Sequence, residues 1–579
     1  MKLRLVLLTL LAFFSAVLLA FRFGETGQNT LVSNIAKDYK KTIARCSPDW
    51  EQLSAWLEEV VIPPIAGSGT HKWSISTRYD SAQFYFNQGI NMYYSFHIIE
   101  SMASFKKAEK LDPDCAMLPW AQALAYGPNI NDLGYSASPE ALKASAKALE
   151  LSGQCTEKEK LLIQAMQVRY SADTTQTRAM LNQLYVDKLK EAYSKYPGDA
   201  DVAALYVDAM MLQHPWDLWN IDGTPKPWTP WIREVLEKLL AKHPEHPGAN
   251  HYYIHVMEPS PYADKALPSA DRLGKITPGL AHTVHMPSHI YLRTGNYDKG
   301  VTVNENAVNS YRKILPIYAP VTGNDFLYVI HNLHMQANNA MLAGRKEYSV
   351  LSASETSKSI PREYLTDPGA LGNYLQYIEM TGVLIDIRFA RWKELLNRPQ
   401  PFASHVYSNV LHHFGRGMAY SNLSDQVGAR KELEQLRMLL KEKVLQLPFT
   451  PFSPAIKGAT VAENMLLGTI ALMEKDYTAA IAAFREAVNT EENMVYTEPR
   501  DWMLNPKHWL GTAYLAAGKF VEAEKIFLRD LQNNNENMWA LRGLYNALKA
   551  QKKKEATSVL QRFNKAASGA DIRIDSAVL

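Results

Sequence analysis

The sequence predicts an all-α fold: a right-handed solenoid of paired helices with irregular insertions. From Tyr79 onward the residues are typical of helices, with few alternating β-branched stretches and with glycine or proline at the expected helix ends. Similar helical units recur about every 34 residues. A solenoid also accommodates 579 residues, 47% of them apolar, without separate globular domains.

The clearest repeat units lie near the C-terminus. There MLLGTIALMEKDYTAAIAAFREAV and HWLGTAYLAAGKFVEAEKIFLRDL place large and small packing residues at matching positions. This pattern resembles the tetratricopeptide repeat (TPR), and the resemblance implies a TPR-type α-solenoid. The matching residues are Leu467, Gly468, Ala480, Phe484 and Ala487 in the first unit, Leu510, Gly511, Tyr514, Ala523 and Phe527 in the second, and Gly89, Phe105, Ala108 and Pro113 near the other end of the chain.

Two pairs of histidines occupy equivalent positions of successive repeats. His251 and His255 are four residues apart, as are His285 and His289, and the two pairs are offset by 34 residues. Side chains at this spacing lie on one face of a helix. In TPR-type helices the corresponding face lines the concave groove. We therefore expect these four imidazoles to face a shared channel.

Imidazoles at these positions favour a metal site. Neutral imidazole nitrogen binds zinc, copper and iron, and two imidazoles at i and i+4 reach one ion. His251, His255, His285 and His289 are therefore predicted metal ligands, and the identity of the metal stays open. Further groups on the same face are predicted to support these ligands or to hold a second ion: His282, His331, His334, Glu258 and Asp208.

A second interpretation is a scaffold without catalytic activity. TPR-type grooves commonly bind a peptide or a protein partner, and stacked neutral imidazoles could serve such a surface. The two interpretations differ in geometry. A metal site predicts imidazole nitrogens that converge within about 4 Å of one another. A scaffold predicts a strip of side chains that runs along the groove. The metal-site interpretation also allows a metal-dependent enzyme that acts on a small substrate.

The N-terminus predicts export. Lys2 and Arg4 precede a run of seventeen largely apolar residues, which fits either a signal peptide or an N-terminal membrane anchor over residues 1–23. The body would then be periplasmic, free or anchored to the membrane. We divide the rest into an N-terminal helical or linker segment, residues 24–75, and the TPR-like solenoid, residues 76–579. A net charge of +3 gives no signal for nucleic-acid binding.

Two segments depart from the repeat pattern. Residues 213–231 hold four tryptophans and four prolines, which a regular repeat helix would not tolerate, so we expect a structured loop over a helix end or at the rim of a site. The second is VYTEPRDWMLNPKHW, residues 495–509, and the sequence leaves open whether it meets the histidines of the earlier repeats.

Several motifs together are similar to those of large bacterial exported TPR proteins of unassigned function. They are HPWD, HYYIH, HMPSHIY and YTEPRDW, and the resemblance covers roughly Phe84 to Phe563. One departure is FHIIES at residues 96–101, which weakens any role for His97. The resemblance implies an all-helical bacterial protein with a shared polar site, and it supplies no reaction.

Overall fold

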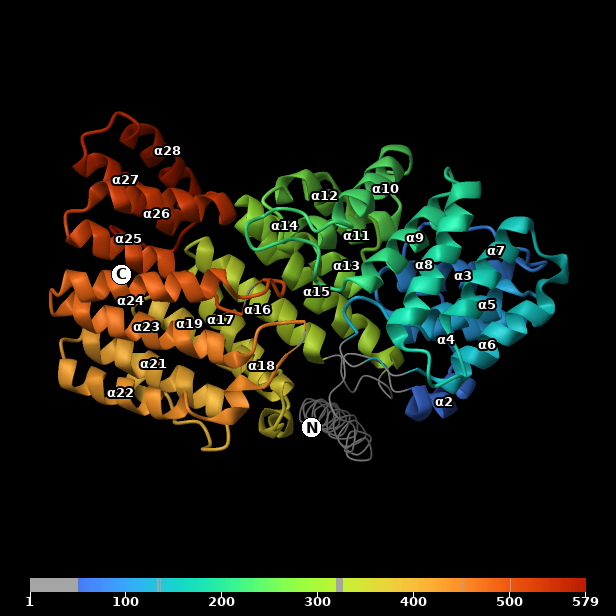
Figure 1. Cartoon of the computed structure of the whole chain (residues 1–579), viewed down its shortest axis with the longest axis horizontal. Helices are drawn as coiled ribbons and strands as arrows, with labels where there is room; N and C mark the ends of the chain where they lie inside the picture. The colour runs from blue at the N-terminus through green and yellow to red at the C-terminus, as the bar shows by residue number, and fades with distance from the viewer. Residues whose placement is uncertain (1–49, 133–134, 136, 319–325, 450, 500) are drawn as a thin grey trace, which may run out of the picture.

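The computed structural model describes residues 50–132, 135, 137–318, 326–449, 451–499 and 501–579. Within these ranges the chain is helical, and its β-structure is confined to isolated bridges between Trp219 and Pro225 and between Phe449 and Phe452. Figure 1 shows helices stacked side by side along an elongated body. The predicted all-α solenoid is confirmed.

The predicted signal or anchor segment, residues 1–23, lies outside the described residues, as does the first part of the predicted linker. Described helices include none that is long and apolar enough to cross a membrane. The linker region contributes one helix and an extended stretch before the first repeat helix begins at Asp80.

The first half of the described chain ends with the long helix before residue 319. It contains α2 (Trp50–Glu59), α3 (Asp80–Tyr94), α4 (Ile98–Leu111), α5 (Met117–Ala125), α6 (Pro139–Glu150), α7 (Glu157–Arg169), α8 (Arg178–Lys195), α9 (Ala200–Gln213), α10 (Thr229–Lys242), α11 (Pro247–Met257), α12 (Leu267–Ile276), α13 (Ala281–His285), α14 (Pro287–Thr294) and α15 (Tyr297–Tyr318). Short 3-10 helices η1 (Leu151–Gln154) and η2 (Ala263–Ala266) interrupt it.

The second half begins at residue 326. It contains α16 (Phe326–Leu342), α17 (Lys346–Lys358), α18 (Ala370–Glu379), α19 (Thr381–Arg388), α20 (Trp392–Asn397), α21 (Val406–Asn422), α22 (Gln426–Leu439), α23 (Ala455–Met473), α24 (Tyr477–Glu492), α25 (Pro506–Ala516), α26 (Phe520–Asn533), α27 (Met538–Ala550) and α28 (Ala556–Ala566). Its 3-10 helices are η4 (Arg362–Thr366) and η5 (Lys443–Gln446).

Glycines on the first helix of a repeat allow the second helix to pack closely. A Cβ atom on Gly468 would overlap the ring of Phe484, and one on Gly511 would overlap the ring of Phe527. Gly89 and Phe105 repeat the arrangement between α3 and α4. Because a larger residue would separate the paired helices, these pairs account for the repeat pattern predicted from the sequence.

The two halves have separate hydrophobic cores that meet at α14 and α15. The turn between α26 and α27 contacts this region: the Tyr297 hydroxyl donates to the Asn535 carbonyl oxygen (2.7 Å), and the Asn535 amide donates to the Arg293 carbonyl oxygen (3.0 Å). In Figure 1 the right-hand end of α26 accordingly lies next to α14 of the first half. The second half thus curls back onto the first.

The irregular segment between α24 and α25, residues 493–499 and 501–505, also reaches the first half. We call it the crossing segment. Its Tyr496 hydroxyl donates to the Glu258 carboxylate at the end of α11 (2.9 Å). The two residues are 238 positions apart in the sequence. The superhelix therefore brings YTEPRDW to the histidine-bearing repeats.

Candidate metal centre

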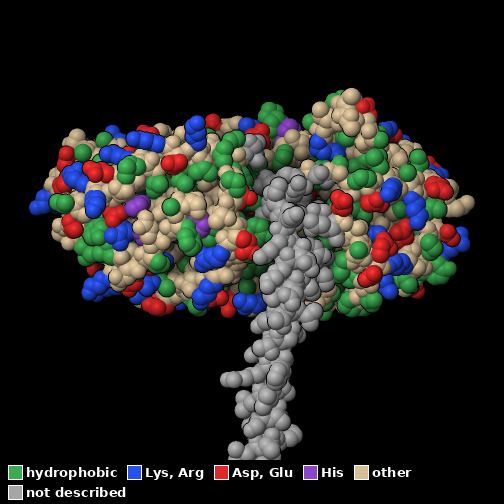
Figure 2. All heavy atoms as spheres, turned by 90° about the horizontal axis from the view of Figure 1, so that it is seen from below, with side chains coloured by type: hydrophobic (Ala, Val, Ile, Leu, Met, Phe, Trp, Pro, Cys, Tyr) green, Lys and Arg blue, Asp and Glu red, His purple; other side chains and the backbone are tan. Residues whose placement is uncertain are grey.

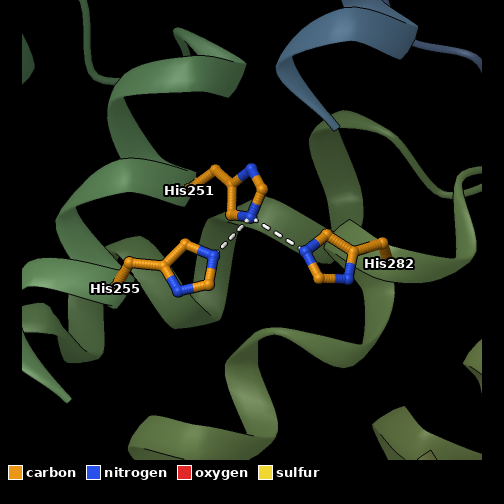
Figure 3. Close-up of side chains that lie close together, drawn as sticks. All are labelled: His251, His255 and His282. Carbon is orange, nitrogen blue, oxygen red and sulfur yellow. Dashed lines mark hydrogen bonds between the residues drawn. The ribbon is translucent and has the colours of Figure 1, made fainter. Parts of the chain in front are cut away.

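Six imidazoles converge in two groups of three. The first triad is His251, His255 and His282, and the second is His285, His289 and His331. In the first, the Nε2 atom of His251 lies 3.0 Å from that of His255 and 3.1 Å from that of His282. Figure 3 shows the three rings turning these nitrogens toward one point. The two triads are adjacent, because the ring centroids of His282 and His285 are 6.3 Å apart.

The second triad repeats this arrangement. The Nε2 atom of His285 lies 2.8 Å from that of His289 and 3.0 Å from that of His331. His251 and His285 are therefore the central members of their triads, since each faces two neighbouring Nε2 nitrogens.

Hydrogen bonds on the far side of both central rings fix their tautomers. His251 Nδ1 lies 2.7 Å from the backbone carbonyl oxygen of Tyr94, which only accepts. His285 Nδ1 lies 2.5 Å from Asn304 Oδ1, and the Asn304 amide nitrogen donates to the Gly300 carbonyl oxygen, which fixes the orientation of that amide. Both neutral central rings must therefore carry their proton on Nδ1, leaving a lone pair on Nε2.

This assignment gives each triad too few hydrogen-bond acceptors among its Nε2 atoms. A lone pair on Nε2 accepts one hydrogen bond well, yet two nitrogens face it at hydrogen-bond distance. At least one close nitrogen–nitrogen contact in each neutral triad is therefore unsupported by a hydrogen bond. A cation placed among the three nitrogens would accept all three lone pairs.

The donor spacing suits such an ion. Zinc–nitrogen bonds of about 2.0–2.1 Å at tetrahedral angles separate two donors by roughly 3.3 Å. The central Nε2 atoms lie 2.8–3.1 Å from their neighbours. The donors of each triad all lie within 4.8 Å of one another. Shifts of a few tenths of an ångström would bring each central contact to that spacing, and an ion held by three donors would keep one position open.

A carboxylate joins the two triads from behind. Glu258 places one oxygen 3.1 Å from His255 Nδ1 and the other 3.2 Å from His289 Nδ1. Glu498, from the crossing segment, lies 2.9 Å from His255 Nδ1. A carboxylate at Nδ1 orients a ligating imidazole and increases the basicity of its other nitrogen. Glu258 therefore connects the ligands of both prospective ions.

Burial favours uncharged imidazoles at most of these positions. It lowers the pKa of His285 to about 4, and it lowers the pKa values of His251, His289 and His331 well below the usual range, with neighbouring histidines adding to the effect. His255 differs: burial would lower its pKa, but Glu498 and Glu258 raise it. Neutral imidazole is the form that binds metal ions.

Aromatic side chains enclose the first triad. The Phe96 ring lies 4.5 Å from the His251 ring and 5.5 Å from the His282 ring, centroid to centroid, and Trp216 lies 5.6 Å from His255. Phe96, Trp216 and Glu498 have positive φ angles, 56°, 62° and 59°. Non-glycine residues in this conformation cluster at functional sites, and here all three contact His255.

Local sequence places the histidines on short helices. Pro247 begins α11, where its missing N–H costs no hydrogen bond, and the His246 side chain accepts from the Ala249 N–H. Pro287 separates α13 from α14, yet His285 and His289 keep the spacing of one helical turn and face each other. The fold thus holds the i, i+4 pairs that the sequence predicted.

The four predicted ligands divide between the triads rather than forming one shell. His251 and His255 belong to the first triad and His285 and His289 to the second. Two of the supporting candidates, His282 and His331, complete these triads, and Glu258 lies between them. His334 instead contacts the Thr381 hydroxyl (2.8 Å), and Asp208 accepts from the Tyr93 hydroxyl (2.9 Å).

The structure also differs from the expectation of an open groove. Exposure of the imidazoles of His251, His255, His282, His285 and His289 does not exceed 3%. They are covered by Phe96, by the tryptophan-rich segment that includes Trp216, and by the crossing segment. Two contributors escaped the sequence analysis: Asn304, whose role depends on helix packing, and Phe96, which lies in a turn where the pattern gives no sign of the site.

Fold and site together define an all-α TPR-type solenoid with two buried, adjacent histidine triads. No family model matches the chain, and no curated protein matches its sequence. Among solved structures, human IFIT1 with m7Gppp-AAAA has 12% identity and a TM-score of 0.28, with 86% of this chain and 92% of that chain covered. Yeast Tom70 has 12% identity and a TM-score of 0.29, with 84% of this chain and 93% of that chain covered. The P58(IPK) TPR domain has 12% identity and a TM-score of 0.21, with 81% of this chain and 98% of that chain covered.

These likenesses are too distant to carry an argument about function. The solenoid is established by the paired helices of this chain and by their glycine–phenylalanine packing.

Proposed function

We propose that this protein binds two transition-metal ions, one in each histidine triad, and that the pair forms a dinuclear centre. The observation that carries the proposal is the fixed tautomer of each central histidine, which turns an Nε2 lone pair toward two further imidazole nitrogens. Neutral imidazole donors suit zinc, copper and iron.

The arrangement favours metal binding over a peptide-binding strip. Nitrogens from α11, α13, α14 and α16 converge within 2.8–3.1 Å of the two central Nε2 atoms. Side chains that recognise a peptide would instead be spread along an exposed surface. The buried position of the triads supports the same choice, because a peptide could reach them only after the covering segments had moved.

A metal-dependent reaction is part of the proposal. Three protein ligands leave an open position at each ion, where water, dioxygen or a small substrate could bind. His331 is partly exposed, and the Glu498 side chain is 12% exposed, so solvent contacts the site at these two residues. We also propose export to the periplasm, on the basis of residues 1–23.

Elemental analysis tests metal binding. Protein purified without a His tag and without chelator should contain up to two equivalents of a transition metal, and the double variant His251→Ala, His285→Ala should contain none. Each substitution removes the nitrogen at the centre of one triad. Circular dichroism should show retained helicity in the variant, and reconstitution with zinc or copper should restore metal only in the parent.

His334→Ala provides the matched control. This imidazole is buried on the same helix as His331 but contacts Thr381, so the variant should keep the metal content of the parent. A parent protein that stays free of metal after reconstitution would contradict the proposal and return the search to protein partners. Metal retained by the double variant would contradict the assignment of the site.

A further inference from the structure

We propose that the two triads hold a pair of copper ions that binds dioxygen between them. The inference rests on the proposed function and adds the identity of the ions and the class of substrate. It is carried by three observations: all six donors are imidazoles, the carboxylates contact the rings at Nδ1, and aromatic rings pack against the first triad.

The donor set favours copper, above all as Cu(I). Cuprous ion accepts three neutral nitrogen donors and adds only one positive charge to a buried site, whereas a divalent ion adds two. Glu258 and Glu498 lie close enough to offset charge but face Nδ1 of His255 and His289. Two Cu(I) ions are therefore accommodated more readily than two divalent ions, because charge in a buried site is stabilised only when it is compensated.

The surroundings favour a small apolar ligand. Phe96 stacks on the rings of His255 and His282, each with an interplanar angle of 22°. Tyr328 lies against His282 at 5.6 Å between ring centroids. Such aromatic walls favour a small uncharged ligand such as dioxygen over a charged substrate. Dioxygen would enter where solvent contacts the second triad, at the partly exposed His331.

The triads are close enough to act together. One carboxylate, Glu258, contacts an imidazole of each triad, and the rings of His282 and His285 are neighbours. The donor nitrogens of each triad converge on one point, so two ions would lie side by side with their open positions available to one bridging molecule.

The reaction balances without a further reactant. Each Cu(I) gives one electron to dioxygen, which becomes a peroxide dianion that bridges two Cu(II) ions. Two copper–oxygen interactions form, the O–O bond order falls from two to one, and no proton is taken up. The total charge of the site does not change, and the reverse electron transfer releases dioxygen.

Anaerobic reconstitution of the full-length protein with Cu(I) tests the inference. Copper is counted after removal of excess metal, dioxygen is then admitted, and its uptake is measured together with the electron paramagnetic resonance of Cu(II). We expect two copper ions per chain, one dioxygen per two copper ions, and a Cu(II) signal that is almost absent because the bridged ions are magnetically coupled.

A ligand variant distinguishes the possible failures. His331→Ala removes one donor of the second triad, so it should lose dioxygen uptake and show a Cu(II) signal from the remaining ion after oxidation. His334→Ala, one helical turn away, should behave like the parent. Two bound copper ions that take up no dioxygen, or that give the full Cu(II) signal, would overturn this inference and leave metal binding intact. A parent that binds neither copper nor zinc would overturn both proposals.

Discussion

At the scale of single residues, Glu258 links the two triads. Its two oxygens lie at the Nδ1 atoms of His255 and His289, and Tyr496 donates to it from the crossing segment. Burial and the neighbouring Glu498 raise the pKa of the Glu258 carboxyl. A bound cation on the other side of the imidazoles would favour its ionised form. Ion binding at either triad would therefore act on a side chain shared with the other.

Substitution of Glu258 should weaken the binding of both ions, whereas substitution of Glu498 should weaken the binding of one. Glu258→Gln removes a carboxylate from His255 and His289, and loss of such a partner typically costs 10–100-fold in metal affinity. Glu498→Gln affects His255 of the first triad. Competition with a chromophoric chelator measures the two affinities. Equal losses at both ions in Glu498→Gln would contradict this division of roles.

Asp208, away from the triads, should make stability depend on pH. Burial raises the pKa of Asp208 to about 6, against the effects of Arg169 and of the Tyr93 hydroxyl. The folded protein thus binds this proton more tightly than the unfolded chain, whose aspartate pKa is about 3.9. The resulting stabilisation is fully present below about pH 4 and is lost as the pH rises to about 6.

Asp208→Asn removes this dependence. The free energy of unfolding of the variant minus that of the parent should increase by about 2–3 kcal/mol between pH 4 and pH 7. Thermal or urea unfolding at several pH values measures the difference, in which groups common to both proteins cancel. Asp222→Asn, an exposed carboxyl whose pKa is lowered by hydrogen bonds from Thr224, is the control and should not show the increase. A flat difference for Asp208→Asn would contradict the assignment.

At the scale of elements, the repeat helices were predictable and the coverings of the site were not. The spacing of Gly468 and Phe484 within a repeat determines local packing, so the pattern is readable from the sequence. The histidine pairs were readable for the same reason. Their division into triads depends on how α11, α13, α14 and α16 cross, which local periodicity does not encode.

The contacts of the crossing segment were likewise not predictable from local sequence. Its irregularity was evident from the sequence, and so was the presence of Tyr496 and Glu498. Their contacts with α11 depend on the accumulated curvature of many repeats between residues 258 and 496. Small angular differences at each repeat determine that curvature. A pattern confined to one repeat cannot supply it.

The glycine–phenylalanine pairs make a prediction about helix packing. In Gly511→Ala the added methyl group would overlap the Phe527 ring, so we expect a loss of about 1–3 kcal/mol in the free energy of unfolding. Gly153→Ala is the matched control, because a Cβ there meets open space, and it should change stability by less than about 0.5 kcal/mol. Denaturant titration of both variants measures the difference; similar stabilities would show that the repeat has room to relax.

At the scale of the whole molecule, the candidate centre lies where the two halves meet. The triads draw ligands from α11, α13 and α14 in the first half and from α16 in the second, and the crossing segment closes over them. Figure 2 shows acidic and basic side chains interspersed on the visible face on both sides of the middle. The histidines of the candidate centre, by contrast, lie inside the molecule, since five of the six are buried.

Metal binding should stabilise both halves together. An ion that binds the folded protein at about 1,000 times its dissociation constant adds about 4 kcal/mol to the free energy of unfolding. Calorimetry with zinc or Cu(I) should therefore show a higher unfolding temperature than with chelator. The shift should disappear in the His251→Ala, His285→Ala variant. An unchanged transition in the parent would contradict tight binding at these triads.

The crossing segment has a consequence for the order of biosynthesis. A ribosome delivers His251 long before it delivers Glu498, which contacts His255 from the other side of the molecule. During that interval the nascent chain has its first histidines but neither the carboxylate of Glu498 nor the hydroxyl of Tyr496. The complete set of contacts around His255 can therefore form only after residue 498 has been made. Under the proposed function, a metal ion supplied earlier would meet ligands that still lack these two partners.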